Sequence, residues 1–145
     1  MTRPLAAALV LSAMACASGP PPPATLDTRS DTCRNCRMVV SDRHFAAQIV
    51  ASGEEPAFFD DLGCLRAYLE RQGTPAGAVV YVADHRTGDW VPAPSAVYTK
   101  VTGLETPMGG GMTAHADEAS RKADPAAAGG SDVPRSDVMG QAGGR

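Results

Sequence analysis

Two stretches poor in large apolar residues bracket the part of this chain that is able to form a packed core. Residues 17–31 are rich in Pro, Ser, Thr and Asp, and residues 124–145 are rich in Gly, Pro and Ala. Such segments bury too little apolar surface to offset the entropy that ordering them costs. We therefore expect one small domain over residues 33–123, followed by a largely disordered tail that holds at most a short strand near Val133.

The chain begins with the pattern of a secretory signal peptide. Arg3 precedes an apolar run over residues 5–15, which has the length of a signal-peptide core and is shorter than the roughly 20 residues needed to cross a bilayer. No second run of this kind follows. We therefore expect residues 1–15 to be removed from the mature protein.

Cys16 follows the predicted signal peptide directly. Ala13 and Ala15 are small, as cleavage requires, and a cysteine after the cut resembles a bacterial lipobox, although Ala13 stands where leucine is usual. Lipidation of Cys16 would make residues 16–32 a Pro-rich tether, extended as polyproline II. We expect a lipid-anchored protein at the periplasmic or cell-surface face of a bacterial membrane; secretion with cleavage at another small residue is the alternative.

Hydrophobic patterning within residues 33–123 predicts an α+β domain. Leu62, Leu65 and Leu69 repeat at helical spacing, and residues 78–83 form a nearly continuous apolar run, typical of a central strand. The order ββαβ, followed by further strands and a helix, favours α+β. The expected elements are a hairpin with strands over 45–51 and 57–59, a helix begun by Asp60 or Asp61 and ended by Gly73, the strand over 78–83, short strands at 90–91 and 97–101, and a helix over 114–123 capped by Thr113 and ended by Pro125.

Charge and motifs exclude several functions. Thirteen basic residues stand against sixteen acidic ones, a net charge of −3, whereas a nucleic-acid-binding protein normally has a basic excess. The sequence shows no Ser/His/Asp order, no Walker-type phosphate loop and no carboxylate pair suited to hydrolysis. We therefore expect no enzyme and no nucleic-acid partner.

Sulfur is the informative part of the composition. Cys33, Cys36 and Met38 place two thiols and a thioether within six residues, and such soft donors favour cuprous copper over hard cations. A zinc site would need a second Cys or His pair, and a c-type haem site would need histidine where Arg37 stands. A thioredoxin-like redox pair remains a rival, as does a disulfide within the pair or from either cysteine to Cys64.

Two further sulfurs lie downstream. Cys64 falls beside the leucine stripe of the predicted helix, where a buried small apolar residue, a ligand and a disulfide partner are all open interpretations. Met108 lies in the segment Thr-Pro-Met-Gly-Gly-Gly-Met, whose glycines offer it no side chains to pack against and allow the backbone to approach an ion. Met112 and His115 are close to this segment, and their roles stay open.

Taken in order, these motifs resemble the NosL family. The resemblance rests on Cys-x-x-Cys-x-Met at residues 33–38, Phe-Phe-Asp-Asp-x-Gly-Cys-Leu at 58–65, Trp90 with Tyr98, and Thr-Pro-Met-Gly at 106–109. The family comprises lipid-anchored, extracytoplasmic copper-binding proteins similar to the accessory factor of nitrous oxide reductase assembly. Its fold is α+β, with two small ββαβ-like halves.

The resemblance implies a copper chaperone rather than an enzyme. Cu⁺ would be held by Cys36, Met38 and Met108, with Cys33 as in members that carry the fuller motif. The carrier would deliver copper to a membrane transporter complex or to nitrous oxide reductase itself. The chain departs from the pattern at His115, where members usually have a large apolar residue, and in its Gly- and Ala-rich tail.

Overall fold

A computed structural model describes residues 19–140. The predicted signal peptide and Cys16 lie outside these residues. No helix within 19–140 is long and apolar enough to cross a membrane. The elements are η1 (Arg43–Phe45), β1 (Ala47–Val50), β2 (Ala57–Phe59), α1 (Leu62–Gln72), β3 (Val79–Ala83), β4 (Trp90–Pro92), η2 (Ala93–Ser95), β5 (Val97–Lys100), β6 (Met112–His115), α2 (Glu118–Ala123), η3 (Pro125–Ala127), β7 (Ser131–Val133) and α3 (Arg135–Met139).

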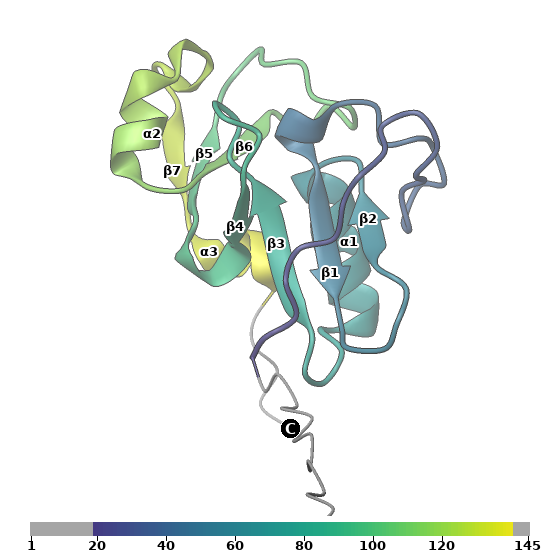
Figure 1. Ribbon diagram of the computed structural model, residues 1–145. Coiled ribbons are helices and arrows are strands. Elements are labelled where there is room, and N and C mark those ends of the chain that lie inside the picture. Colours follow the sequence, from purple (N-terminus) through teal and green to yellow (C-terminus); the bar gives the residue numbers. More distant parts are fainter. Residues whose placement is uncertain (1–18, 141–145) are drawn as a thin grey trace, which may run out of the picture.

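The first sheet has the strand order β2-β1-β3-β4, all antiparallel (Figure 1). β1 and β2 form the predicted hairpin, with Ala47 opposite Phe59. β3 is flanked by β1 and β4, as its continuous apolar run predicts. All four residues of β1 are buried, so the sheet is covered on both faces.

Helix α1 forms where the sequence predicts it. Asp61 is the N-cap residue and accepts a hydrogen bond from the backbone N–H of Cys64, while the predicted leucine stripe is buried. Gly73 ends the helix with φ of 70°, and its N–H donates to the carbonyl of Leu69. The aromatic ring of Phe59 in β2 packs against that of Tyr68 in α1, with 5.1 Å between centroids.

The N-terminal linker is partly built into the domain, contrary to the expected tether over residues 16–32. Gln48 in β1 is fully buried and exchanges two hydrogen bonds with the backbone of Ala24, of 2.8 and 3.2 Å. Leu26 is buried in the same core. The segment is ordered because the backbone of Ala24 satisfies the otherwise unpaired amide of Gln48.

The second sheet has the order β6-β5-β7. The expected helix over 114–123 is wrong in its first part. Residues 112–115 form strand β6, which pairs with β5 from Val97 opposite His115 to Lys100 opposite Met112. Helix α2 begins later, capped by Asp117 instead of Thr113. The sequence misleads here because Thr113, a good cap residue, is buried in the strand.

The expected disorder of the tail is wrong for residues 124–140, which form η3, β7 and α3. The predicted short strand near Val133 is confirmed as β7, which pairs with β5 through Tyr98 and Val133. Val138 in α3 is fully buried in the core cluster, and α3 packs against α1. Few apolar residues suffice because this segment completes an existing sheet and does not build a core of its own.

The domain consists of two halves with one topology, which confirms the α+β class and the two ββαβ-like halves. In the first half, the β1–β2 hairpin is followed by α1 and then by β3, which pairs with β1. In the second, the β5–β6 hairpin is followed by α2 and then by β7, which pairs with β5. β4 extends the first sheet as an additional strand (Figure 1).

A matching turn precedes each half. In the first turn, the N–H of Cys33 donates to the carbonyl of Met38 (2.7 Å), and the N–H of Arg37 donates to the carbonyl of Cys33 (3.0 Å). In the second turn, the N–H of Asp84 donates to the carbonyl of Asp89 (2.8 Å), and the N–H of Gly88 donates to the carbonyl of Asp84 (2.7 Å). Arg37 and Gly88 both have positive φ, 68° and 75°. Asp84 therefore occupies in the second half the position that Cys33 occupies in the first.

The buried tail allows a direct test of this fold. Val138→Ala should lower the free energy of unfolding by about 2 kcal/mol, because two buried methyl groups are lost and a cavity remains. Val39→Ala is the matched control, since this valine is 42% exposed, and should change stability by no more than about 0.5 kcal/mol. Equal midpoints for the two variants in urea denaturation would show that α3 does not pack on the domain.

Candidate metal centre

The loop of residues 33–38 is held in a tight turn at the end of the first sheet. Thr32 and Val39 form a bridge across its base, and Arg34 donates its N–H to the carbonyl of Phe58 at 2.7 Å. Arg37 is the one non-glycine residue of the described chain with positive φ, a conformation that costs a residue with Cβ about 1 kcal/mol. The backbone of Cys33 is therefore anchored both within the loop and to β2.

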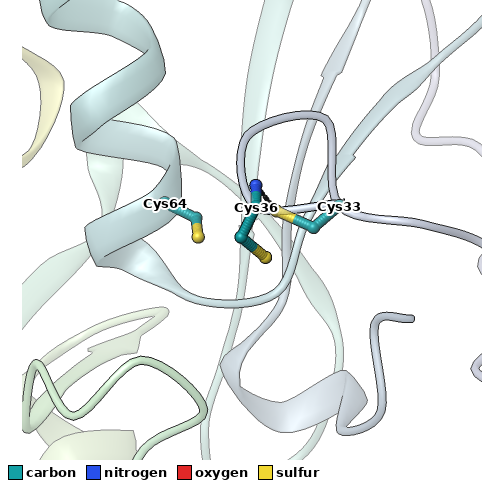
Figure 2. A group of neighbouring side chains, drawn as sticks. All are labelled: Cys33, Cys36 and Cys64. Carbon is teal, nitrogen blue, oxygen red and sulfur yellow. Dashed lines mark hydrogen bonds between the residues drawn. The ribbon is translucent and has the colours of Figure 1, made fainter. Parts of the chain in front are cut away.

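Three thiols meet between this loop and the first turn of α1. The Sγ atoms of Cys33, Cys36 and Cys64 all lie within 4.8 Å of one another. Figure 2 shows Cys64 projecting from the helix toward the two loop cysteines. Cys33 and Cys64 are buried, Cys36 is half-buried, and all three are free thiols in the structure.

The three thiols differ in their tendency to ionise. Burial opposes ionisation of Cys33, but hydrogen bonds from the backbone N–H groups of Cys36, Asp60 and Asn35, and from the Cys36 thiol, outweigh it, so its pKa is lowered. Burial raises the pKa of both Cys36 and Cys64. Cys33 is therefore the thiol of the cluster that loses its proton most readily, and the Cys36 thiol helps to stabilise its thiolate.

Polar side chains close the cluster on the helix side. The amide of Asn35 donates to the Sγ of Cys64 at 3.5 Å, and Arg71 from the last turn of α1 donates to the Asn35 carbonyl oxygen at 2.5 Å. The backbone N–H of Cys36 points at the Sγ of Cys33, also at 3.5 Å. The cluster thus has donors aimed at sulfur, which suits a thiolate.

Asp61 connects the cluster with the predicted methionine loop. One carboxylate oxygen accepts the N–H of Cys64 at 2.9 Å, and the other accepts the N–H of Met108 at 3.0 Å and the hydroxyl of Thr106 at 3.3 Å. The carboxylate is 2% exposed. Residues more than forty positions apart are therefore held on opposite oxygens of a single side chain.

The structure brings some of the predicted site residues together and leaves others at the surface. Cys33 and Cys36 lie in the cluster, whereas the side chains of Met38 and Met108 are 48% and 44% exposed. The Met38 carbonyl accepts the N–H of Cys33, so its backbone is part of the loop. The exposed thioethers belong to segments that border the thiol cluster.

Cys64 is the residue whose place the sequence left open. The signal that could have placed it is the N-cap Asp61 three residues before it, because this spacing puts a side chain in the first helical turn. Met112 is half-buried against the core, and His115 lies in a separate group with His85 and Asp124.

A cluster of three sulfur donors selects soft or borderline metal ions over hard cations. Binding displaces the protons of the un-ionised thiols, because only the thiolate is a good ligand. In the folded state the donors are already gathered, so little of the binding energy is spent on ordering them.

Comparison with known proteins gives one clear result. The family model described as NosL matches residues 23–142. No curated protein and no solved structure matches the chain significantly. The matched region includes the cysteine loop, α1 and the segment that carries Met108.

Asp61→Asn should release the Met108 segment while keeping the helix cap. Asn caps a helix as well as Asp does, so its oxygen stays on the N–H of Cys64 and its NH₂ group faces the N–H of Met108, which loses its acceptor. We expect the free energy of unfolding to fall by about 1–3 kcal/mol, with faster amide hydrogen exchange at Met108.

Asp117→Asn is the matched control, because this exposed carboxylate caps α2 through Ser120. It should change stability by only a few tenths of a kcal/mol. If both variants lose the same stability and Met108 exchange is unchanged, Asp61 acts as a helix cap alone.

Proposed function

Since the chain belongs to the NosL family, whose members bind copper, we propose that it is a copper(I) carrier working outside the cytoplasm. The observation that carries the proposal is the cluster of Cys33, Cys36 and Cys64, with its three sulfur atoms within 4.8 Å of one another. Cu⁺ is the cargo that this donor set fits best, because thiolate and thioether donors favour the soft cuprous ion. The role is transport, without catalysis.

Loading is proposed to begin at the thiolate of Cys33. Its pKa is lowered by the backbone donors that outweigh its burial, so this thiol gives up its proton to an arriving metal ion more readily than Cys36 or Cys64 does. Coordination by Cys36 or Cys64 then releases a proton from each thiol that binds.

Release is proposed to use the exposed thioethers. Met38 and Met108 are almost half exposed, while Cys33 and Cys64 are buried. Exposed neutral sulfur donors bind Cu⁺ without proton exchange, so they suit the transfer of Cu⁺ from the buried thiols to a partner's soft ligand. The partner's donor can enter before the carrier's thiolates leave, which avoids a free copper ion.

The proposed setting is the periplasmic or cell-surface face of a bacterial membrane, where Cys16 carries a lipid and the domain meets its recipient. The recipient would be a membrane copper-transporter complex or nitrous oxide reductase, as the family resemblance implies. A thiol–disulfide oxidoreductase and a disulfide-stabilised structural lipoprotein are the competing roles for Cys33 and Cys36, and the copper experiment separates them.

Cuprous titration tests the proposal. The full chain, kept anaerobic and reduced, is titrated with Cu⁺ against a chromophoric chelator. Cys33→Ser and Cys36→Ser should each weaken binding by at least about tenfold, or 1.4 kcal/mol, because a thiolate donor is lost. Met38→Leu and Met108→Leu keep the side-chain volume and should weaken binding less, while slowing transfer of Cu⁺ to the chelator.

Met139→Leu is the matched control, since this methionine is packed against the core at the end of α3. It should leave both affinity and transfer rate unchanged. Full affinity in both Cys33→Ser and Cys36→Ser would overturn the carrier proposal. Catalytic turnover of a disulfide substrate without copper binding would favour the oxidoreductase, and a permanent Cys33–Cys36 disulfide the structural lipoprotein.

A further inference from the structure

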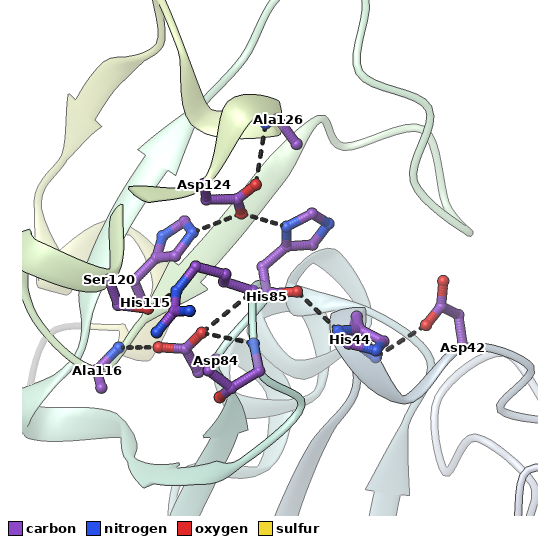
Figure 3. A network of polar contacts seen from close by, with 11 residues as sticks. Asp42, His44, Asp84, His85, His115, Ala116, Ser120, Asp124 and Ala126 are labelled. Atoms are coloured by element: carbon purple, nitrogen blue, oxygen red, sulfur yellow. Dashed lines mark hydrogen bonds and ion pairs between the residues drawn. The ribbon is translucent and has the colours of Figure 1, made fainter. Parts of the chain in front are cut away.

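A second group of metal-binding side chains lies in the other half of the domain, away from the thiols. His85 follows β3, His115 ends β6, and Asp124 joins α2 to η3. Nδ1 of His85 and Nε2 of His115 lie 2.6 and 2.9 Å from the same Asp124 oxygen, Oδ2. Figure 3 shows the carboxylate between the two rings.

Two of these residues, His115 and Asp124, correspond to aromatic residues in the first half of the domain. His115 pairs with Val97 at the place where Phe59 pairs with Ala47, and each pair joins the equivalent strands of its hairpin. The two helices can be aligned on their N-cap residues, Asp61 and Asp117. The residue seven positions after the cap is Tyr68 in the first half and Asp124 in the second. An aromatic pair in contact, Phe59 with Tyr68, therefore corresponds to a histidine and an aspartate in contact.

Structural need alone does not account for this exchange. The first half shows that the fold accepts two aromatic rings at these positions, and replacing buried polar pairs by apolar ones is often neutral or stabilising. His115 is fully buried, and its Nδ1 has no hydrogen-bond partner within residues 19–140. A buried ring nitrogen without a partner costs free energy, so the histidine is retained at a cost.

The position of the cysteine cluster is filled differently in the second half. Asp84 stands where Cys33 stands, and Ser120 follows its N-cap aspartate as Cys64 does. Asp84 accepts backbone N–H groups of Arg86, Thr87 and Ala116 at 2.8–3.0 Å. This carboxylate fixes the turn that carries His85, just as the Cys33 loop is fixed in the first half.

We infer that His85, His115 and Asp124 form a second metal site, for a divalent cation of borderline softness such as Zn²⁺. Two imidazole nitrogens and one carboxylate oxygen suit such an ion, whereas the thiols suit Cu⁺. His85 is partly accessible, with 13% of its side chain exposed, so an ion would reach the site from the His85 side. Asp124 brings a negative charge to the site, as carboxylates do near neutral pH, and both imidazoles already lie against it.

Bound metal would fasten three separate segments of the second half. The ligands come from the turn after β3, from β6 and from the α2–η3 junction. Asp124 also accepts the N–H of Ala126 through its other oxygen, at 2.9 Å, so its orientation is fixed before the metal binds. We therefore expect the cation to stabilise the C-terminal part of the domain.

Zn²⁺ titration of the reduced full chain, followed by ¹H–¹⁵N spectra of the histidine rings, tests this inference. Zn²⁺ should shift the signals of His85 Nδ1 and His115 Nε2 and raise the melting temperature. Asp124→Asn should weaken this binding by at least about tenfold, because a charged ligand is lost. Both effects should persist in Cys33→Ser/Cys64→Ser, which removes two thiols of the other cluster.

Two variants serve as controls. Asp132→Asn makes the same charge change at an exposed carboxylate of β7 and should bind Zn²⁺ as the unmodified chain does. His115→Phe places in β6 the residue that β2 has at the equivalent position; it should fold and fail to bind. Unshifted ring signals in the unmodified chain, or equal affinity in Asp124→Asn and Asp132→Asn, would overturn the inference even if His115→Phe did not fold.

Discussion

A single buried carboxylate ties the thiol cluster to the methionine segment. Asp61 begins α1 and orients Cys64 with one oxygen, and holds the backbone of Met108 with the other. Burying a carboxylate is costly unless its oxygens are paired, so both contacts must form together. The cysteine loop, α1 and the methionine segment are separated in sequence. Asp61 joins α1 to the methionine segment, and Cys64 in the first turn of α1 meets the thiols of the cysteine loop.

The domain presents one backbone arrangement twice with different chemistry in each half. The first half carries thiols at the turn and the helix start, where the second carries Asp84 and Ser120. The core pair differs as well, aromatic in the first half and His115 with Asp124 in the second. The scaffold therefore fixes where side chains converge, while the residue types decide which metal ions they suit.

The sequence predicted elements well where local pattern and tertiary setting agree. The β1–β2 hairpin, α1 and β3 follow from apolar spacing, an N-cap aspartate and a terminal glycine. Prediction failed around Thr113 and in residues 124–140, where structure comes from pairing with β5 and not from local preference. The prediction of a free linker failed for the same reason, because Ala24 is held by a hydrogen bond to Gln48, which lies 24 positions away in the sequence.

By itself the sequence determined the kind of donor that this protein offers, because sulfur in the Cys-x-x-Cys-x-Met segment is soft whatever the fold. It also determined that Cys33 and Cys36 lie close together, since two intervening residues cannot separate them widely. Only the tertiary structure decided that Cys64 joins them, that Cys33 is the thiol with the lowered pKa, and that His85, His115 and Asp124 meet. These outcomes depend on burial and on hydrogen bonds from distant segments, which no local pattern encodes.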